Sequence, residues 1–598
     1  MKELHSVAPT QLQMADVAQA VEEALGELVR GRAGERIWSR DTSFWTDDPN
    51  PSQVVATRLG WLEVLELMSA QLPAIQSLVE DVRSEGFRHA LLLGMGGSSL
   101  APEVLRLTFG VAPGHLDLRV LDNTSPEAVR AAAAAAELPR TLFVVSTKSG
   151  TTTETLSFMK YFEARLAEAG VSSPGRHFVA ITDPGTPLAE RAALKGFRHT
   201  FLNPPDIGGR YSALSLFGVV PAALLGVDAR ALLQSAAAMA ESCGPGRPVE
   251  DNPGAVLAAA VSGAARSGLD KLTILTSPAL ESFGAWLEQL VAESTGKEGR
   301  GVVPVDGEPW GAPQAYGTDR MFAALALEGE HQAVEDLAMQ LVGASHPVAR
   351  WRLPDRAALG GEFFRWEMAT ALTGALLQVD PFDEPNVTES KVTTTALLKT
   401  RAEKGAFPPL IELVNRGGLS LQADELWAKG LRSAVTGRGL DPNEPATWLA
   451  VHLATAQDGD YIALCAYLHR TEARHARLGG IRRMLGVGRA TTLGYGPRFL
   501  HSTGQLHKGG PNTGVFLQVT ASEEADLGIP GEAFTFGQLR DAQALGDLKV
   551  LDRRGRRALR VHLPGGADSG LTALEAAMVR AMELTGFALS KRARRGSS

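Results

Sequence analysis

The chain has 598 residues, 44% of them hydrophobic, which is enough for more than one domain with a substantial core. Its formal charge of −8 argues against a nucleic-acid-binding surface, so any positive charge that a ligand needs must be local. Two cysteines, Cys243 and Cys465, are too few for a disulfide framework and favour a reducing compartment.

Residues 1–80 are predicted to form an N-terminal helical segment. Apolar residues recur at helical spacing in VAQAVEEALGELV and in RLGWLEVLELMSAQLPAI. The first residues have no apolar core of signal-peptide length, and no later run approaches the roughly 18 apolar residues of a membrane span. We therefore expect a cytoplasmic protein.

Residues 81–235 alternate short apolar strands, such as HALLLGM and TLFVVST, with helical stretches, which is typical of a parallel doubly wound sheet in an α/β protein. A second such pattern begins at KLTILTS and predicts a second domain over 236–395. Pro- and Gly-marked joints in a mainly helical pattern predict a helical insertion over 396–455. Residues 456–598 repeat the strand–helix–strand order, so they are predicted to complete the second domain through an internal duplication.

Two turns rich in glycine and hydroxyl residues each follow a strand and open a helix: LLLGMGGSS at 91–99 and VVSTKSGTTTET at 144–155. Backbone N–H groups, hydroxyls and the helix N-terminus can there converge on an anion. Capping a helix uses one hydroxyl, whereas the second turn offers five around Gly150 and lacks the Walker spacing. The second turn therefore predicts a cradle for a sugar phosphate. For the first turn, an ordinary helix-capping turn remains the alternative.

The two turns together resemble the sugar isomerase (SIS) domain of phosphoglucose isomerases. Three further segments resemble signatures of the same family: IGGRYSALSLFGVVPAALLG at 207–226, WLEQLVAESTGKEGRGVVPV at 286–305 and VDPFDEPNVTESK at 379–391. The C-terminal half is similar to the isomerase portion of transaldolase–phosphoglucose isomerase fusion proteins. The resemblance implies two SIS domains and a cytoplasmic homodimer. The implied reaction interconverts glucose 6-phosphate and fructose 6-phosphate through an enediolate, in glycolysis and gluconeogenesis, with no metal or redox cofactor.

The resemblance also assigns catalytic roles. Glu293, in ESTGK, matches the base that moves a proton between C1 and C2, and a carboxylate on an apolar helix face can have the raised pKa that suits a base. Arg210 matches the arginine that stabilises the enediolate, and Gly209 beside it permits close backbone approach. Gln289, one helical turn before Glu293, matches a substrate contact. A helix-surface Glu or Gln and a turn-capping Arg are the structural alternatives.

The family's phosphate and sugar contacts fall on both turns, at Gly97, Ser98, Thr147, Lys148, Ser149 and Thr152. Lys391 matches a lysine associated with ring opening, although a solvated lysine on a helix is the alternative. Seven residues earlier, Glu384 stands where the family commonly has glutamine, which leaves this contact in question because a second carboxylate adds negative charge near the sugar.

The histidine that protonates the ring oxygen in the family has no direct counterpart. The corresponding stretch, YGTDRMFAAL, has Met321 where a histidine is expected. The missing pattern occurs instead as LHSTGQ at 500–505, in the suspected second copy. We therefore predict His501 as the ring-opening acid, with His507 as the weaker candidate, because an imidazole can give and retake a proton near neutral pH.

Two other functions stay open. A non-catalytic sugar-phosphate-binding protein would keep the phosphate cradle without turnover, and Met321 is the residue that favours it. The intact Glu293 and Arg210 motifs favour an enzyme. An isomerase that also accepts mannose 6-phosphate is the second alternative, since epimer choice depends on pocket contacts that no motif identifies.

Overall fold

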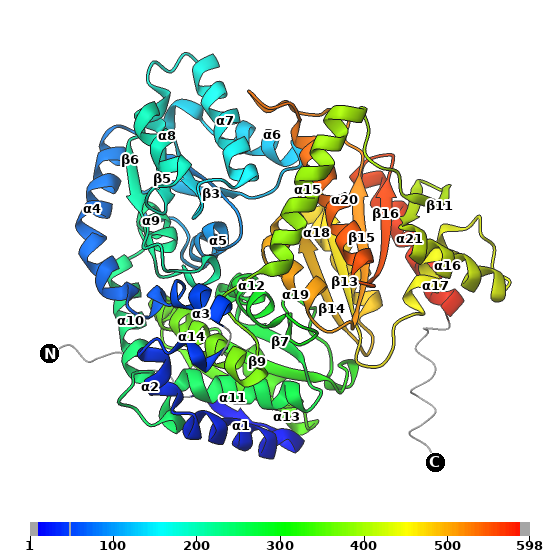
Figure 1. Ribbon diagram of the computed structural model, residues 1–598, viewed down its shortest axis with the longest axis horizontal. Coiled ribbons are helices and arrows are strands. Elements are labelled where there is room, and N and C mark those ends of the chain that lie inside the picture. Colours follow the sequence, from blue (N-terminus) through cyan, green and yellow to red (C-terminus); the bar gives the residue numbers. More distant parts are fainter. Residues whose placement is uncertain (1–9, 47–48, 586–598) are drawn as a thin grey trace.

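The computed structural model describes residues 10–46 and 49–585, which fold around three β-sheets (Figure 1). The predicted α/β class with parallel doubly wound sheets is confirmed. None of the helices in the described ranges is long and apolar enough to span a membrane.

The first sheet is parallel throughout, in the order β3-β2-β4-β5-β6. Its strands are β2 (His89–Gly94), β3 (Asp117–Leu121), β4 (Thr141–Ser146), β5 (Phe178–Thr182) and β6 (His199–Leu202). The helices of this unit are α4 (Val64–Ser84), α5 (Gly97–Phe109), α6 (Pro126–Ala135), α7 (Thr153–Glu168), α8 (Pro187–Lys195) and α9 (Leu216–Leu225). The chain reverses direction across the sheet between β2 and β4, which is where open α/β sheets bind ligands. Both predicted turns begin at the carboxyl ends of these two neighbouring strands.

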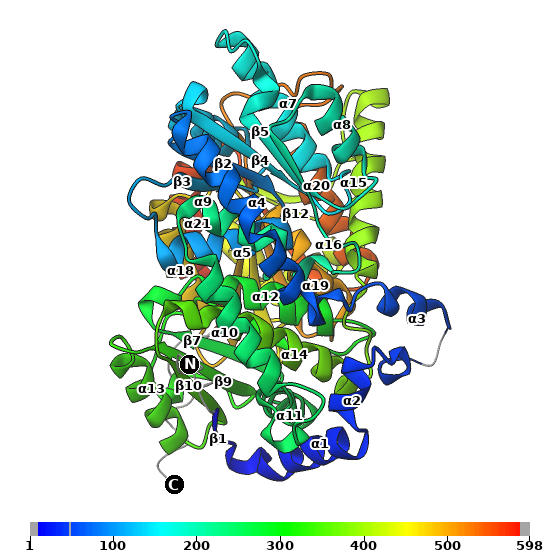
Figure 2. The ribbon, with the colours of Figure 1, turned by 90° about the vertical axis from the view of Figure 1, so that its left-hand side faces the viewer.

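The second sheet has the order β1-β10-β9-β7-β8, with only β1 antiparallel. Its strands are β1 (Gln11–Gln13), β7 (Lys271–Thr276), β8 (Val303–Val305), β9 (Arg320–Leu327) and β10 (Val348–Leu353). Of the predicted N-terminal segment, the structure describes residues 10–46 and 49–80, and these are mainly helical, with β1 as a short strand. Its helices are α1 (Ala18–Arg30), α2 (Ala33–Trp38) and α3 (Pro49–Ala56), and Figure 2 shows α1 lying along α11. The other helices of this unit are α10 (Ala229–Ser242), α11 (Pro253–Arg266), α12 (Phe283–Thr295), α13 (Gln332–Gly343) and α14 (Leu359–Leu377).

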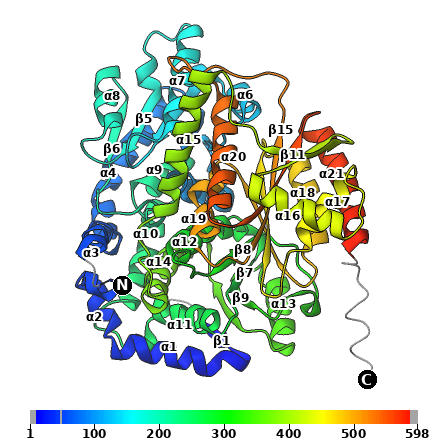
Figure 3. The ribbon, with the colours of Figure 1, turned by 45° about the vertical axis from the view of Figure 1, so that its right-hand side comes forward.

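The third sheet has the order β11-β12-β16-β15-β13-β14. Its strands are β11 (Ile411–Arg416), β12 (Leu419–Ala423), β13 (Tyr461–Tyr467), β14 (Ala490–Tyr495), β15 (Gly514–Ala521) and β16 (Arg557–Leu563). The helices are α15 (Pro385–Lys404), α16 (Glu425–Gly437), α17 (Pro445–Leu453), α18 (Glu472–Leu485), α19 (Gly504–Gly509), α20 (Phe536–Arg553) and α21 (Ala567–Thr585). Figure 3 shows α15 and α20 side by side between this sheet and the first unit.

The second and third sheets repeat one topology. Four parallel strands follow the order β10-β9-β7-β8 in one and β16-β15-β13-β14 in the other, and an antiparallel strand, β1 or β12, pairs on the same edge. This repeat is what the predicted duplication requires. The third sheet is nevertheless separate from the second, so residues 456–598 do not add strands to it.

The segment 396–455 contains the end of α15 and all of α16 and α17, as the helical prediction requires, but it also contains a hairpin that was not predicted. Residues 411–423 form the hairpin β11–β12, whose second strand pairs with β16. Gly417 and Gly418 both have positive φ, at 62° and 81°, which is the backbone that a tight hairpin turn needs. The apolar alternation in IELVNRGGLSLQA is the strand signal, and the glycine pair is a turn rather than a joint between helices.

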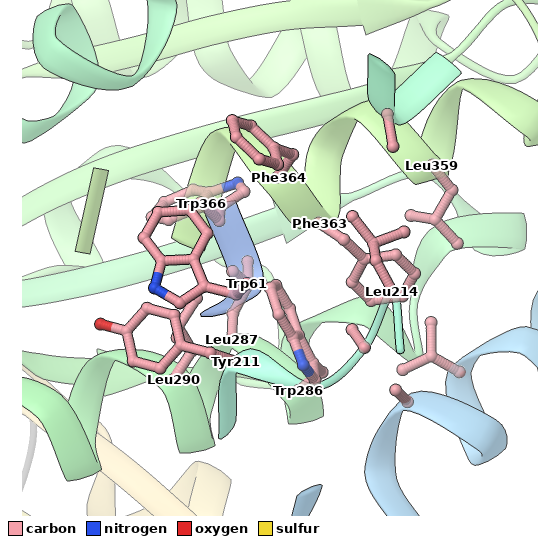
Figure 4. Close-up of a cluster of buried hydrophobic side chains, with 14 of the residues drawn as sticks. Trp61, Tyr211, Leu214, Trp286, Leu287, Leu290, Leu359, Phe363, Phe364 and Trp366 are labelled. Atoms are coloured by element: carbon pink, nitrogen blue, oxygen red, sulfur yellow. The ribbon is translucent and has the colours of Figure 1, made fainter. Parts of the chain in front are cut away.

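An aromatic core fixes the helices that reach the site (Figure 4). Trp286 of α12 packs edge-on against Phe363 of α14, with ring centroids 4.8 Å apart. Trp61 stacks on Tyr211 at 5.4 Å. Because large buried aromatic rings allow little movement, this core sets the position of α12 and of the turn that contains Tyr211.

Candidate active site

Glu293 lies on the last turn of α12 and is 6% exposed. One Glu293 oxygen lies 3.4 Å from Nη1 of Arg210, and the other accepts a hydrogen bond from Gln289 Nε2 at 3.1 Å. Burial raises the pKa of Glu293 and the Glu384 charge raises it further, while the guanidinium of Arg210 and the Gln289 bond act against the rise. The net rise in pKa makes this carboxylate a stronger base than an exposed glutamate.

Arg210 is held by groups from two segments, the end of α12 and residues 381–384. Its Nε donates to Ser294 Oγ at 2.9 Å, and Nη2 donates to the carbonyl oxygens of Pro381 and Asp383 at 2.9 and 2.7 Å. Nη1 lies 3.3 Å from Glu384, so the carboxylate that replaces the family's glutamine faces this cation. Burial lowers the pKa of Arg210, but Glu293 and Glu384 raise it by more, and the guanidinium stays charged.

The second glycine turn borders a cavity of about 250 Å³. Of the predicted residues, Ser149, Thr152, Lys391 and His501 line it. The hydroxyls of the turn bond one another, with Thr147 and Thr152 2.7 Å apart, and Thr152 makes no cap bond to the following helix α7. These hydroxyls and the N-terminus of α7 are therefore arranged to receive an anion. Lys148 lies to one side, where its ammonium pairs with Asp183.

The first turn approaches the segment of Arg210 very closely. A methyl group on Gly97 would come within 1.9 Å of the Gly209 carbonyl oxygen, so only glycine allows this contact. At Gly96, whose φ is +56°, a Cβ would lie 3.0 Å from Gln289 Nε2 and 3.1 Å from His501 Cβ. The first turn therefore meets Gln289, His501 and the segment that contains Arg210. Ser98, next in the first turn, is buried.

His501 ends a short 3-10 helix that follows β14. Its Nε2 lies 3.1 Å from Oε1 of Glu154, and Gln289 Nε2 donates to its backbone carbonyl at 2.8 Å. Gln289 thus bonds to both Glu293 and His501. Burial raises the pKa of Glu154, but the bond to His501 and its charge lower it by more, so this carboxylate is kept ionised.

The structure does not place the alternative histidine residue in this cavity. His507 is buried among the rings of Phe499, Tyr461 and Phe516, and burial lowers its pKa to about 3. Met321 lies within strand β9 and is 1% exposed, so a titrating ring at that position would be enclosed in the sheet's core.

Two buried residues of the site were missed from the sequence. Glu154 stands inside the quoted motif VVSTKSGTTTET, where it resembles an ordinary acidic residue in the first turn of a helix. Gln543, on α20, donates from Nε2 to Glu154 Oε1 at 2.7 Å and lines the same cavity. No local pattern marks Gln543, because its partner lies 389 residues away in the chain.

Comparison with known proteins identifies the family. The family model for phosphoglucose isomerase matches residues 63–309. A glucose-6-phosphate isomerase of Rubrobacter xylanophilus is 32% identical over 380 residues, which cover 54% of this chain and 86% of that protein. One from a Cyanothece strain is 31% identical over 288 residues, covering 48% of this chain and 53% of the relative.

Solved structures agree on the fold. A hypothetical protein from Thermus thermophilus superimposes with a TM-score of 0.56 at 25% identity, over 65% of this chain and 99% of that one. A glucose-6-phosphate isomerase from Chlamydia trachomatis gives 0.50 at 19% identity, over 65% and 86%. This chain is therefore longer than the part that it shares with these proteins. By its family model and its Rubrobacter relative, the chain belongs to the phosphoglucose isomerase family.

Proposed function

We propose that the chain is a glucose-6-phosphate isomerase, which interconverts glucose 6-phosphate and fructose 6-phosphate. The observation that supports this most directly is the position of Gln289, whose amide bonds to both Glu293 and His501. The Glu293 carboxylate and the main chain of His501, which lie far apart in the sequence, are thereby linked through one side-chain amide. A binding protein would need the phosphate cradle but not this pair.

Ring opening comes first. His501 gives a proton to the ring oxygen while the C1 hydroxyl gives its proton to solvent water, the C1–O5 bond breaks, and the C1 carbonyl forms. His501 lines the cavity together with Lys391 and the hydroxyls of Ser149 and Thr152. We assign the phosphate group to these hydroxyls and to the N-terminus of α7, and the sugar ring to the space between them and His501.

Proton transfer follows in the open-chain sugar. Glu293 removes the proton from C2, the C–H electron pair forms the C1–C2 double bond, and the carbonyl electrons move to O1. The resulting enediolate is negatively charged, and Arg210 lies 3.4 Å from the base, where its fixed positive charge stabilises it. The proton of the C2 hydroxyl then passes to O1, which shifts the negative charge to O2. Return of the proton from Glu293 to C1, with the carbonyl re-formed at C2, gives the ketose.

A coupled assay tests this function. Purified protein is given fructose 6-phosphate with EDTA present, and glucose 6-phosphate is detected by its oxidation with a specific dehydrogenase. We expect turnover that is insensitive to EDTA, because neither step needs a metal. Binding of fructose 6-phosphate without any turnover would contradict the proposal and favour a sugar-phosphate-binding protein.

The assembly and location are part of the same proposal. By analogy with the family we propose a homodimer in the cytoplasm, where the buried and unpaired Cys243 and Cys465 would stay reduced. Sedimentation equilibrium of the active preparation is expected to give twice the chain mass of 63.4 kDa. A fully active species at the single-chain mass would contradict the dimer.

A further inference from the structure

A chain of hydrogen bonds passes three times between the first and third units of the molecule. Thr124, after β3, donates from its hydroxyl to Gln543 Oε1 at 2.8 Å. Gln543, on α20, donates from Nε2 to Glu154 Oε1 at 2.7 Å, and the same oxygen lies 3.1 Å from His501 Nε2. All but the histidine are at least nine-tenths buried, and His501 is 14% exposed at its side chain.

The amide in this chain can point only one way. A hydroxyl can donate or accept, but a carboxylate without a proton can only accept, so Gln543 must direct its NH₂ to Glu154 and its oxygen to Thr124. Flipping the amide would place its oxygen against the carboxylate and leave two buried oxygens without a proton between them. The Glu154 carboxylate therefore sets which way the Gln543 amide points, and the Thr124 hydroxyl stabilises that orientation by donating to the amide oxygen.

The position of Thr124 is itself secured by its neighbours. Asp122 pairs with Arg498 at 2.5 Å, Asn123 donates to the Leu468 carbonyl at 2.9 Å, and Ser125 donates to Glu523 at 2.7 Å. The segment 122–125 thus bonds across to the third unit at each of its residues. Since Arg498 and His501 belong to the same 3-10 helix, the contacts of residues 122–125 with the third unit hold both ends of the hydrogen-bond chain.

We propose that Gln543, oriented by Thr124, is a positioning residue: it holds the Glu154 carboxylate on Nε2 of His501, so that Nδ1 is the ring nitrogen that exchanges a proton with the sugar. Because Glu154 can only accept, Nε2 must be the N–H in the neutral ring. Within the part of the chain that the structure describes, no protein group bonds to Nδ1 of His501. The inference rests on the proposed isomerase function, since it concerns the ring-opening step alone.

The first experiment measures ring opening separately from isomerisation. Exchange NMR follows the interconversion of the α and β forms of glucose 6-phosphate, which requires opening and closure of the ring but no transfer of a carbon-bound proton. In Gln543→Met, which keeps the length of the side chain but loses both hydrogen bonds, we expect enzyme-catalysed anomer exchange to fall by about tenfold or more, the size typical of losing a group that orients a functional imidazole. Thr124→Val should slow exchange in the same direction, and Thr124→Ser should restore the wild-type rate.

A control separates positioning from loss of a buried amide. Gln518 of β15 also donates to α20, at the Ala544 carbonyl, but does not line the cavity. Gln518→Met should therefore unfold at a lower temperature while keeping its anomer-exchange rate. If the wild type is an active isomerase, and Gln543→Met and Thr124→Val exchange the anomers at the wild-type rate, the inference is overturned.

The second readout does not depend on catalysis. The ¹⁵N chemical shifts of the His501 ring report which nitrogen is protonated, and we expect the Nε2–H tautomer in wild type and a mixture of tautomers in Gln543→Met. Wild-type protein without turnover but with this tautomer shift would contradict the proposed function and leave the positioning role standing. An Nδ1–H ring in wild type would contradict the positioning role whatever the activity.

Discussion

Glu293→Gln is expected to lower the turnover of fructose 6-phosphate by a factor of about 10³, within the range that a general base contributes. The amide keeps the shape of the carboxylate and can still accept the Gln289 hydrogen bond, but it cannot take up the C2 proton. The coupled assay measures the loss. Anomer exchange of glucose 6-phosphate should survive, because ring opening does not use this residue.

The same substitution should leave the fold intact or stabilise it at neutral pH. The folded-state pKa of Glu293 is raised above its ordinary value of 4.5, so the folded protein binds this proton more tightly than the unfolded chain does. Protonated Glu293 therefore adds to the free energy of unfolding. This contribution is fully present below pH 4.5 and is lost as the pH rises through the raised pKa. Glutamine has no charge to bury, so the difference in Tm between variant and wild type should grow with pH across this interval and then level off.

Glu288→Gln is the matched control. Glu288 lies on the same helix, and burial, together with the charge of Asp306, raises its pKa well above the ordinary value. The charged neighbours of Glu288 are Asp306 and Arg482, whereas those of Glu293 include Arg210 and His501. We expect wild-type turnover in this variant. A comparable loss of activity in Glu288→Gln would mean that α12 is sensitive to any such change, and that the Glu293 result does not identify the base.

Much of this fold is predictable because local pattern and tertiary structure agree in it. The strand–helix alternation predicts the parallel sheets, and glycine- and hydroxyl-rich turns after two strands predict a ligand site at their carboxyl ends. The strand order puts β2 beside β4, which brings both turns together. In contrast, Glu154 and Gln543 could not be paired from the sequence, since their contact depends on how α20 packs across the first unit.

The repeated topology explains where the histidine lies. In the second unit the strand β9 contains Met321 within the sheet, whereas in the third unit the stretch between β14 and the equivalent strand β15 contains His501. One unit of the repeat therefore contributes the helix with Glu293, and the other contributes the imidazole. The sequence indicates the repeated strand–helix–strand order, but the contact between the two copies, through Gln289 and the His501 carbonyl, is visible only in the folded protein.

This division predicts the effect of His501→Ala. We expect anomer exchange of glucose 6-phosphate and net isomerisation to fall together, by a factor of about 10², because both need the ring to open and a positioned proton donor contributes about that much. Glu293→Gln should affect isomerisation alone. The two variants would thus separate ring opening from carbon proton transfer, with exchange NMR and the coupled assay as the two measurements.

Added imidazole gives a sharper form of this test. Truncation of His501 to alanine enlarges the cavity beside Glu154, whose carboxylate remains to accept an N–H from a free imidazole. Millimolar imidazole is expected to restore anomer exchange in His501→Ala, and it should not restore isomerisation in Glu293→Gln. His475→Ala removes an imidazole of the same unit that bonds the Tyr495 hydroxyl at 3.2 Å, and it should leave both rates unchanged. If His501→Ala opened the ring at the wild-type rate, another group would have to be the acid, and Lys391, which lines the same cavity, would be the next residue to replace.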